Sequence, residues 1–228
     1  MTIAYVKSAS VYANTALILN GVAAGNLLVA FASTYKQQAV SPPVFSDNKG
    51  GTWNTLTHYG GPSASNIWTA IGYSMNAAGG NTTVSLASYG NDPGWSLHEY
   101  SGIATSLAFD KETGKYLETA NPATDNVLTT QDNELLVGIL ADESIDYATT
   151  FGTGWNQRTA ETSHIHITAD KIVSSAGNYN YSMTRSASYV VLVMATFKGA
   201  AAPPTGAPHL GKIIKATSPR PHPRAFGI

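Results

Sequence analysis

The chain lacks cysteine and is poor in charge. Without cysteine, neither a disulfide framework nor a zinc site built on thiolates is available. Asp, Glu, Lys and Arg make up 12% of the 228 residues, against about a quarter in an average globular protein. No apolar run approaches the length of a membrane span, and the N-terminal MTIAYVKSAS lacks the basic and apolar segments of a secretory signal. We therefore expect neither membrane insertion nor export, and a surface that partners cover or that faces harsh surroundings.

The usual signatures of enzymes are missing as well. The chain contains no Gly-x-Ser-x-Gly, no phosphate-binding loop and no dinucleotide fingerprint. Acidic pairs such as Asp110 with Glu112, or Asp142 with Glu143, have the residue types of a glycosidase, but such pairs are common in loops. We expect no catalytic residues, no cofactor and no enzymatic activity.

The chain does contain an internal repeat. Gly-Thr-Gly-Trp-Asn at 152–156 resembles Gly-Gly-Thr-Trp-Asn at 50–54. Five further segments match in the same order: 5–6 with 116–117, 27–29 with 135–137, 65–69 with 163–167, 78–81 with 176–178, and 99–102 with 196–199. The offset shrinks from 135 − 27 = 108 to 199 − 102 = 97, as expected when loops change length between conserved strands. The sequence predicts a duplication with halves at about 5–102 and 116–199.

Both halves have the patterns of β-strands. Residues 27–32 and 135–141 are short apolar runs bounded by turn residues, and residues 67–74 alternate as a half-buried strand does. Residues 103–112 are expected to form one short helix between the halves. The prediction is an all-β, jelly-roll-like β-sandwich in one domain, 1–199, with the halves stacked face to face. Two separate small sandwiches are the alternative, but they would leave apolar faces uncovered.

Particular side chains are expected to line one continuous core. They are Leu27, Val29, Phe31, Ile67, Ile71, Leu135, Val137, Ile139, Ile165, Ile167, Val191 and Val193. The tryptophan of each repeat, Trp53 or Trp155, is expected to close one end of this core, because a large aromatic side chain buries about 150–250 Å². A platform for sugar stacking is the alternative role.

Residues 200–228 form a different kind of sequence. They hold six of the eleven prolines and four basic residues but no Asp or Glu, so their side-chain charge is +4, whereas 1–199 carries 9 − 14 = −5. Closely spaced prolines keep the backbone extended, and apolar residues among them are typical of segments that dock on a partner. The residues expected to contact it are Ile213, Ile214, Pro219, Arg220, Pro221, Pro223, Arg224, Phe226 and Ile228. A disordered tail is the alternative; nucleic acid is disfavoured, because the body is acidic and no stacking motif accompanies the basic residues.

Three groups of residues are weaker candidates for binding sites. His164 and His166 lie on one face of a strand, as in some zinc sites, but without a third ligand we interpret them as surface histidines. Asp142, Glu143 and Asp146 have oxygens for calcium, although their spacing fits no known loop, and a solvated loop is favoured. The loop 89–95 offers Tyr89, Asn91, Asp92 and Trp95 for glycan binding; packing of Trp95 on the sandwich is slightly favoured over this role.

The order of these segments resembles a family of β-sandwich domains. Gly-Asn-Leu-Leu-Val at 25–29, Asp47–Trp53, Ala77–Val84 and Glu99–Gly102 together look like domains of phage structural proteins and bacterial surface proteins. The resemblance covers about 5–199 and implies a structural or adhesive role, but it assigns no functional residues. We expect a non-enzymatic component of a phage virion (a decoration, spike or fibre-associated protein) assembled in the host cytoplasm. Its partners are then copies of itself and other virion proteins. A carbohydrate-binding module for a host glycan is the alternative.

Overall fold

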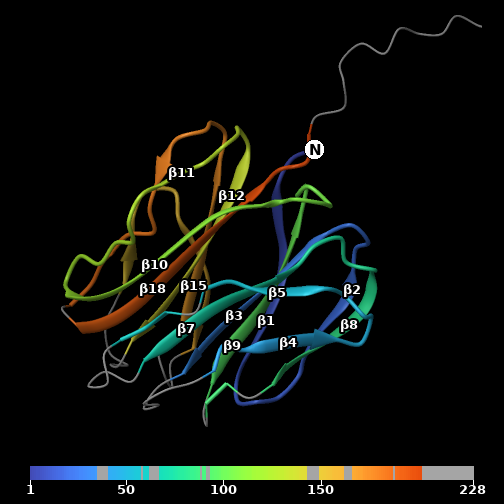
Figure 1. Ribbon diagram of the computed structural model, residues 1–228, viewed down its shortest axis with the longest axis horizontal. Helices are drawn as coiled ribbons and strands as arrows, with labels where there is room; N and C mark the ends of the chain where they lie inside the picture. The colour runs from blue at the N-terminus through green and yellow to red at the C-terminus, as the bar shows by residue number, and fades with distance from the viewer. Residues whose placement is uncertain are drawn as a thin grey trace, which may run out of the picture.

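The computed structural model describes residues 1–34, 41–57, 59–61, 67–87, 89–90, 93–142, 149–161, 166–186 and 188–201. Every regular element in these residues is a β-strand, which confirms the all-β prediction (Figure 1). This part of the chain contains no helix long and apolar enough to cross a membrane.

The first half consists of two facing sheets. The larger sheet contains, in order, β1 (Ala4–Tyr12), β9 (Gly94–Ser101), β3 (Leu27–Thr34), β7 (Trp68–Ser74) and β5 (Trp53–Thr55), with β6 (Tyr59–Gly60) also paired to β7. The smaller sheet contains β2 (Leu17–Val22), β8 (Gly80–Ala87) and β4 (Val44–Asp47). Alternate residues of β3 point to opposite faces, so Leu28 and Ala30 pack toward the smaller sheet, while Leu27 and Val29 point the other way.

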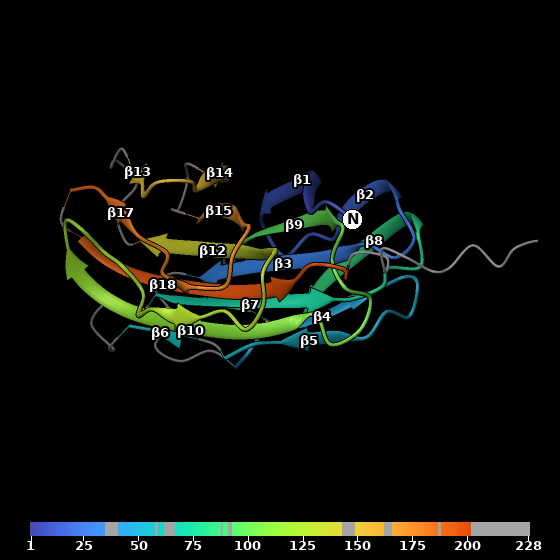
Figure 2. The ribbon, with the colours of Figure 1, turned by 90° about the horizontal axis from the view of Figure 1, so that it is seen from above.

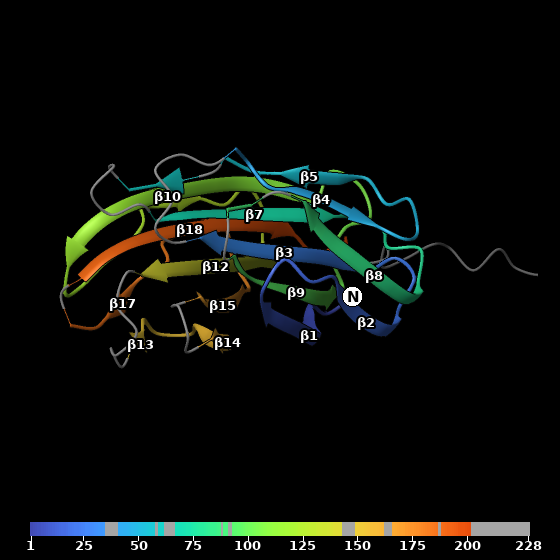
Figure 3. The same ribbon diagram turned by 90° about the horizontal axis from the view of Figure 1, so that it is seen from below.

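The second half has a similar construction. Its large sheet contains, in order, β10 (Phe109–Thr119), β18 (Ser188–Lys198), β12 (Glu134–Asp142), β15 (His166–Val173) and β14 (Asn156–Glu161). Two small ribbons accompany it: β11 (Val127–Leu128) with β16 (Asn178–Tyr179), and β13 (Thr150–Phe151) with β17 (Met183–Thr184). In Figures 2 and 3, β2 and β8 lie toward one end of the molecule, and β13 and β17 toward the other.

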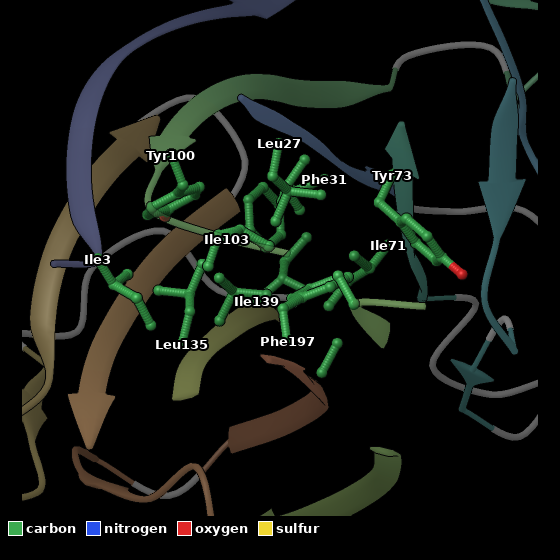
Figure 4. Packing of buried hydrophobic residues seen from close by; sticks show 14 of the residues in the cluster. Ile3, Leu27, Phe31, Ile71, Tyr73, Tyr100, Ile103, Leu135, Ile139 and Phe197 are labelled. Atoms are coloured by element: carbon green, nitrogen blue, oxygen red, sulfur yellow. The ribbon is translucent and has the colours of Figure 1, made fainter. Parts of the chain in front are cut away.

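The two halves pack together through their large sheets. The central core contains apolar side chains from both halves, and Figure 4 shows several of them meeting: Leu27, Phe31 and Ile71 from the first half, and Leu135, Ile139 and Phe197 from the second. Two outer cores lie behind the large sheets, one in each half. Strand β1 contacts β14, and β10 contacts β6, so each half covers an edge of the other.

The prediction of one continuous core is wrong, because the buried apolar residues form several separate clusters. Eight of the twelve expected residues do line the central core: Leu27, Val29, Phe31, Ile71, Leu135, Val137, Ile139 and Val193. Ile67 and Val191 pack in a smaller cluster, Ile167 lies in the outer core of the second half, and Ile165 is outside the described residues. The difference arises because each large sheet is buried on both faces, and therefore needs two cores rather than one.

The expected helix at 103–112 is also wrong. Strand β10 begins at Phe109 and pairs with β18 at ten residue positions. The backbone groups of these residues therefore bond to a neighbouring strand rather than to one another, as they would in a helix. Residues 103–108 form the short connection before it. The second half therefore begins near Phe109 rather than near Tyr116.

The pairing registers of the two halves can be compared strand by strand. Tyr5 pairs with Tyr100 and Phe109 pairs with Phe197, and an irregularity follows each pair directly, after Tyr5 in β1 and after Phe109 in β10. Leu27 lies opposite Tyr100 just as Leu135 lies opposite Phe197. By register, Tyr5 occupies the position in β1 that Phe109 occupies in β10, whereas the sequence alignment pairs Tyr5 with Tyr116.

A second misalignment concerns β7 and β15. Phe31 pairs with Ile71, and its counterpart Ile139 pairs with Thr168, so the register matches Ile71 to Thr168. The corresponding offset is 168 − 71 = 97, whereas the alignment of 65–69 with 163–167 has an offset of 163 − 65 = 98. The sequence alignment is therefore one residue out of step in this strand.

A shift of one residue exchanges the two faces of a strand. This is why Ile167, expected in the shared core, lies in the outer core of the second half. His166 and Thr168 point to the other face of the sheet, toward the first half.

Candidate functional site

The described part of the loop 89–95 is buried rather than presented to a ligand. Trp95 and Tyr89 are both fully buried in the outer core of the first half. The Trp95 indole Nε1–H donates to the Thr15 carbonyl oxygen at 3.2 Å. Neither ring is accessible for sugar stacking, and the favoured interpretation, packing of Trp95 into the sandwich, is confirmed. Asn91 and Asp92 lie outside the described residues.

The acidic candidates are engaged in separate interactions. Asp142 is buried and forms an ion pair with Arg185, so the expectation of a solvated loop is wrong for this residue. Asp110 accepts hydrogen bonds from Thr130 and pairs with Lys198 Nζ at 3.1 Å, whereas Glu112 accepts from the Thr57 backbone N–H at 3.2 Å. Glu143 and Asp146 are outside the described residues, and the described part of the chain holds no group of three or more acidic or histidine side chains placed to hold a metal ion.

His166 is not a surface residue. It is fully buried between the two large sheets, where its Nδ1 lies 3.0 Å from Ser33 Oγ and its Nε2 lies 3.0 Å from Ser96 Oγ. Both serines belong to the first half, so this side chain of the second half is held by hydrogen bonds across the junction. His164 is outside the described residues.

A second histidine extends this polar network. His98 Nε2 lies 3.2 Å from Ser96 Oγ and 3.3 Å from Thr168 Oγ1 of the second half. Its ring is also 4.8 Å from that of Phe31, in an edge-on arrangement. Burial lowers the pKa of His166 to about 3, and burial together with the nearby His166 and Arg158 lowers that of His98 to about 3. Both imidazoles are therefore neutral at physiological pH, each with one donor and one acceptor nitrogen.

An ion pair borders the network. Arg158 donates from Nε and Nη2 to the two carboxylate oxygens of Asp170, at 2.6 and 2.9 Å, and Asp170 is buried. The Arg158 guanidinium also lies 4.1 Å from the ring centre of Tyr5 in the first half. The bidentate ion pair lies within the second half and is geometrically specific. The contact between Arg158 and Tyr5 links it to the first half.

Sequence reasoning missed this network. The signal was present in β15, where His166, Thr168 and Asp170 alternate with apolar residues, as polar side chains on one face of a strand do. The one-residue misalignment of this strand placed its apolar residues on the wrong face. His98 and Ser96 gave no comparable signal, because all of β9 except its last residue is buried.

The repeated tryptophans directly follow the glycine-rich turns of the two halves, and hydrogen bonds hold both indole rings in place. In the first half, the Asp47 carboxylate accepts hydrogen bonds from the Gly51 N–H at 3.0 Å and the Trp53 Nε1–H at 2.8 Å. Although burial raises the pKa of Asp47, these bonds outweigh that effect and lower it. In the second half, Trp155 Nε1–H donates to the Asn180 carbonyl oxygen at 3.2 Å. Trp155 is buried in the outer core of the second half, and Trp53 is half-buried against the outer core of the first half. Both positions agree with the predicted core role.

A hollow lies beside each of these turns. The hollow of the first half, of about 270 Å³, is lined by Leu28, Asp47, Lys49, Gly50, Gly51, Thr52, Ser74, Met75, Asn76, Ala77, Ala78 and Thr82. The hollow of the second half, of about 380 Å³, is lined by Asn126, Gly152, Thr153, Trp155, Lys171, Asn178, Tyr179, Asn180 and Ser182. Among the described residues that line them, each hollow has one lysine, and aromatic side chains line the second hollow but not the first. Both are surface depressions that a small ligand could contact.

The search for relatives gave no match: no family model, no curated protein and no solved structure is significantly similar to this chain. The arm residues from Ile213 to Ile228 lie outside the described residues.

Proposed function

We propose that this protein is a non-enzymatic structural component of a phage virion, attached to neighbouring subunits through its C-terminal arm. One observation carries the proposal. The chain remains hydrogen-bonded to the body until just before the proline-rich segment: the Gly199 N–H donates to the Asn133 carbonyl oxygen at 2.9 Å, and the Ala200 N–H donates to that of Gly102 at 2.8 Å. The arm thus starts from a fixed point at the junction of the two halves.

The construction of the body supports this role. Three hydrophobic cores and a buried polar junction hold its two halves in one orientation. A body that keeps its shape holds its neighbours at fixed positions, as a component of a particle must. Its charge of −5 complements the +4 of residues 200–228, and complementary charge favours association between copies.

We also propose that the body arose by duplication and that each half is jelly-roll-like. In support, the two large sheets have the same order of first, last and third strands, namely β1-β9-β3 and β10-β18-β12. The irregularity after Tyr5 recurs after Phe109, and the pairing of β3 with β9 has the same register as that of β12 with β18. In the first half, β1-β9-β3-β7 faces β2-β8-β4, an arrangement compatible with two interleaved Greek keys.

Truncation after Ala201 tests the arm without disturbing its anchor. Because Ala200 is bonded to Gly102, a chain that ends at Ala201 keeps the body's last hydrogen bond. We expect the truncated protein to give the same circular dichroism spectrum but to sediment as a smaller species than the full chain. If both chains sediment alike at every concentration, the arm does not drive assembly and the proposal is wrong.

A further inference from the structure

The hollow of the second half is built on a fixed frame. The Gly152 N–H donates to the Ser182 carbonyl oxygen at 2.9 Å, and the Trp155 N–H donates back to the Gly152 carbonyl oxygen at 3.2 Å. Gly154, with a φ of 84°, lets the chain turn tightly between them. Because Trp155 is buried and its indole N–H is also bonded, this wall of the hollow is formed before any ligand arrives.

The side chains around the hollow are rich in unused hydrogen-bonding groups. Asn126, Asn178 and Asn180 make no side-chain hydrogen bond to any residue that the structure describes, although the backbone of Asn180 accepts from Trp155. Each carboxamide offers donors and an acceptor, the combination that sugar hydroxyls require. Tyr179, half-buried beside them, contributes part of an aromatic ring to the lining, a surface of the kind on which the C–H face of a sugar can stack.

The hollow carries a positive charge. Among the described residues that line it, Lys171 is the one charged residue and none has a carboxylate. Its ammonium donates to the Thr153 carbonyl oxygen at 2.9 Å and lies 5.6 Å from the ring centre of Tyr179. The two contacts hold the Lys171 ammonium at the hollow. Because an ammonium has three N–H groups and one donates to Thr153, the others can donate to a ligand.

We propose that this hollow binds a carboxylate-bearing sugar unit, such as a uronic acid within a surface polysaccharide. The carboxylate pairs with Lys171, the hydroxyls bond to the asparagine carboxamides, and the ring stacks on Tyr179. A volume of about 380 Å³ is within the range of small-molecule sites. This inference does not depend on the assembly role of the arm, and it places glycan binding away from loop 89–95.

The hollow of the first half provides a matched contrast. It contains Lys49, but Asp47 also lines it and places a carboxylate close to the position of a ligand. Its described lining residues include no aromatic side chain and one asparagine, Asn76. The same position in the two halves therefore differs in the groups that the proposal requires, so the first hollow is expected not to bind acidic sugars.

Nuclear magnetic resonance on the full chain tests the proposal. The probes are galacturonate and glucuronate, with galactose and glucose as their neutral counterparts, and the signal is the indole N–H resonance of Trp155. We expect the acids to shift this resonance at concentrations about tenfold below those at which the neutral sugars do, because a charge-assisted hydrogen bond contributes at least this factor. The indole resonance of Trp53 should not move.

Two variants assign the contacts. Lys171→Gln keeps a donor for Thr153 but removes the charge, so acids and neutral sugars should then bind equally weakly. Asn178→Ala should weaken every sugar by about tenfold, whereas Lys49→Gln in the first hollow should change nothing. The proposal is overturned if neither acid shifts the Trp155 resonance, if acids and neutral sugars shift it equally in the unmodified chain, or if Lys171→Gln leaves the preference for acids intact.

Discussion

Acidification should destabilise this protein through the two buried histidines at the junction of its halves. His98 and His166 have pKa values of about 3 in the folded protein, against about 6.5 in an unfolded chain. Between these values the unfolded chain binds protons that the folded protein does not, so stability falls as the pH falls. The loss begins near pH 6.5 and is complete near pH 3.

The magnitude follows from the difference in pKa. A pH of 5 is about 1.5 units below the pKa of histidine in the unfolded chain. This difference lowers the free energy of unfolding by about 2 kcal/mol for each histidine and by about 4 kcal/mol for both. Neighbouring groups do not reverse this result. Asp170 is held in its ion pair with Arg158. Tyr5 packs edge-on against the His98 ring, and burial raises the pKa of Tyr100, which also lies beside that ring. Burial raises the pKa of Glu134, which opposes the loss rather than causing it.

Urea unfolding at pH 7.5 and pH 5 measures the effect. The free energy of unfolding should drop by about 4 kcal/mol in the unmodified chain and by about half as much in a His166→Asn variant. The comparison rests on the pH dependence, so it remains valid even if the substitution itself costs stability. An equal drop in both proteins would show that His166 is not the titrating group, and the account of the junction would be refuted.

Three further changes test the packing by chemical denaturation. Gly114→Ala should cost about 1–3 kcal/mol, because the added methyl group would overlap the ring of Tyr59 in the other half, and a Tyr59→Ala background should remove that cost; an unchanged cost there would contradict the contact. Arg158→Ala should cost about 3 kcal/mol, since it leaves the buried Asp170 carboxylate unpaired, and a loss below about 0.5 kcal/mol would argue against the pair. Trp155→Ala should cost about 3–5 kcal/mol if the ring is core, and a stable variant would assign it to a surface role.

The strands and the central core could be predicted from the sequence because their signals are local. The Leu-Leu-Val runs at 27–29 and 135–137 became the central strands of the two large sheets. Apolar runs buried on both faces predict a strand correctly, but they do not reveal how many layers surround it. That is why the sequence predicted one core where the described residues form three large cores and one smaller cluster.

The candidate sites were harder to predict, since they depend on register and on contacts distant in sequence. In the sequence Trp95 ends a segment with Asn and Gly that resembles a sugar-binding loop, yet the residue lies in β9 and its ring is buried behind β2 and β8. His98 and His166 are 68 residues apart and meet only when the two sheets stack (166 − 98 = 68). The hollow at Trp155 was indicated indirectly, because the repeated glycine-tryptophan motif borders both hollows, although the sequence favours only a folding role for that motif.

The most direct test of the proposed role is binding between the body and a separate arm. A fluorescent peptide of residues 202–228 is titrated with the chain that ends at Ala201, and its anisotropy is recorded at low and high salt. We predict saturable binding that weakens with salt, because the +4 of the arm meets an acidic body, and that weakens again in a peptide with Phe226→Ala and Ile228→Ala. An anisotropy that stays at the value of the free peptide would contradict the claim that the arm joins one copy of this protein to the next.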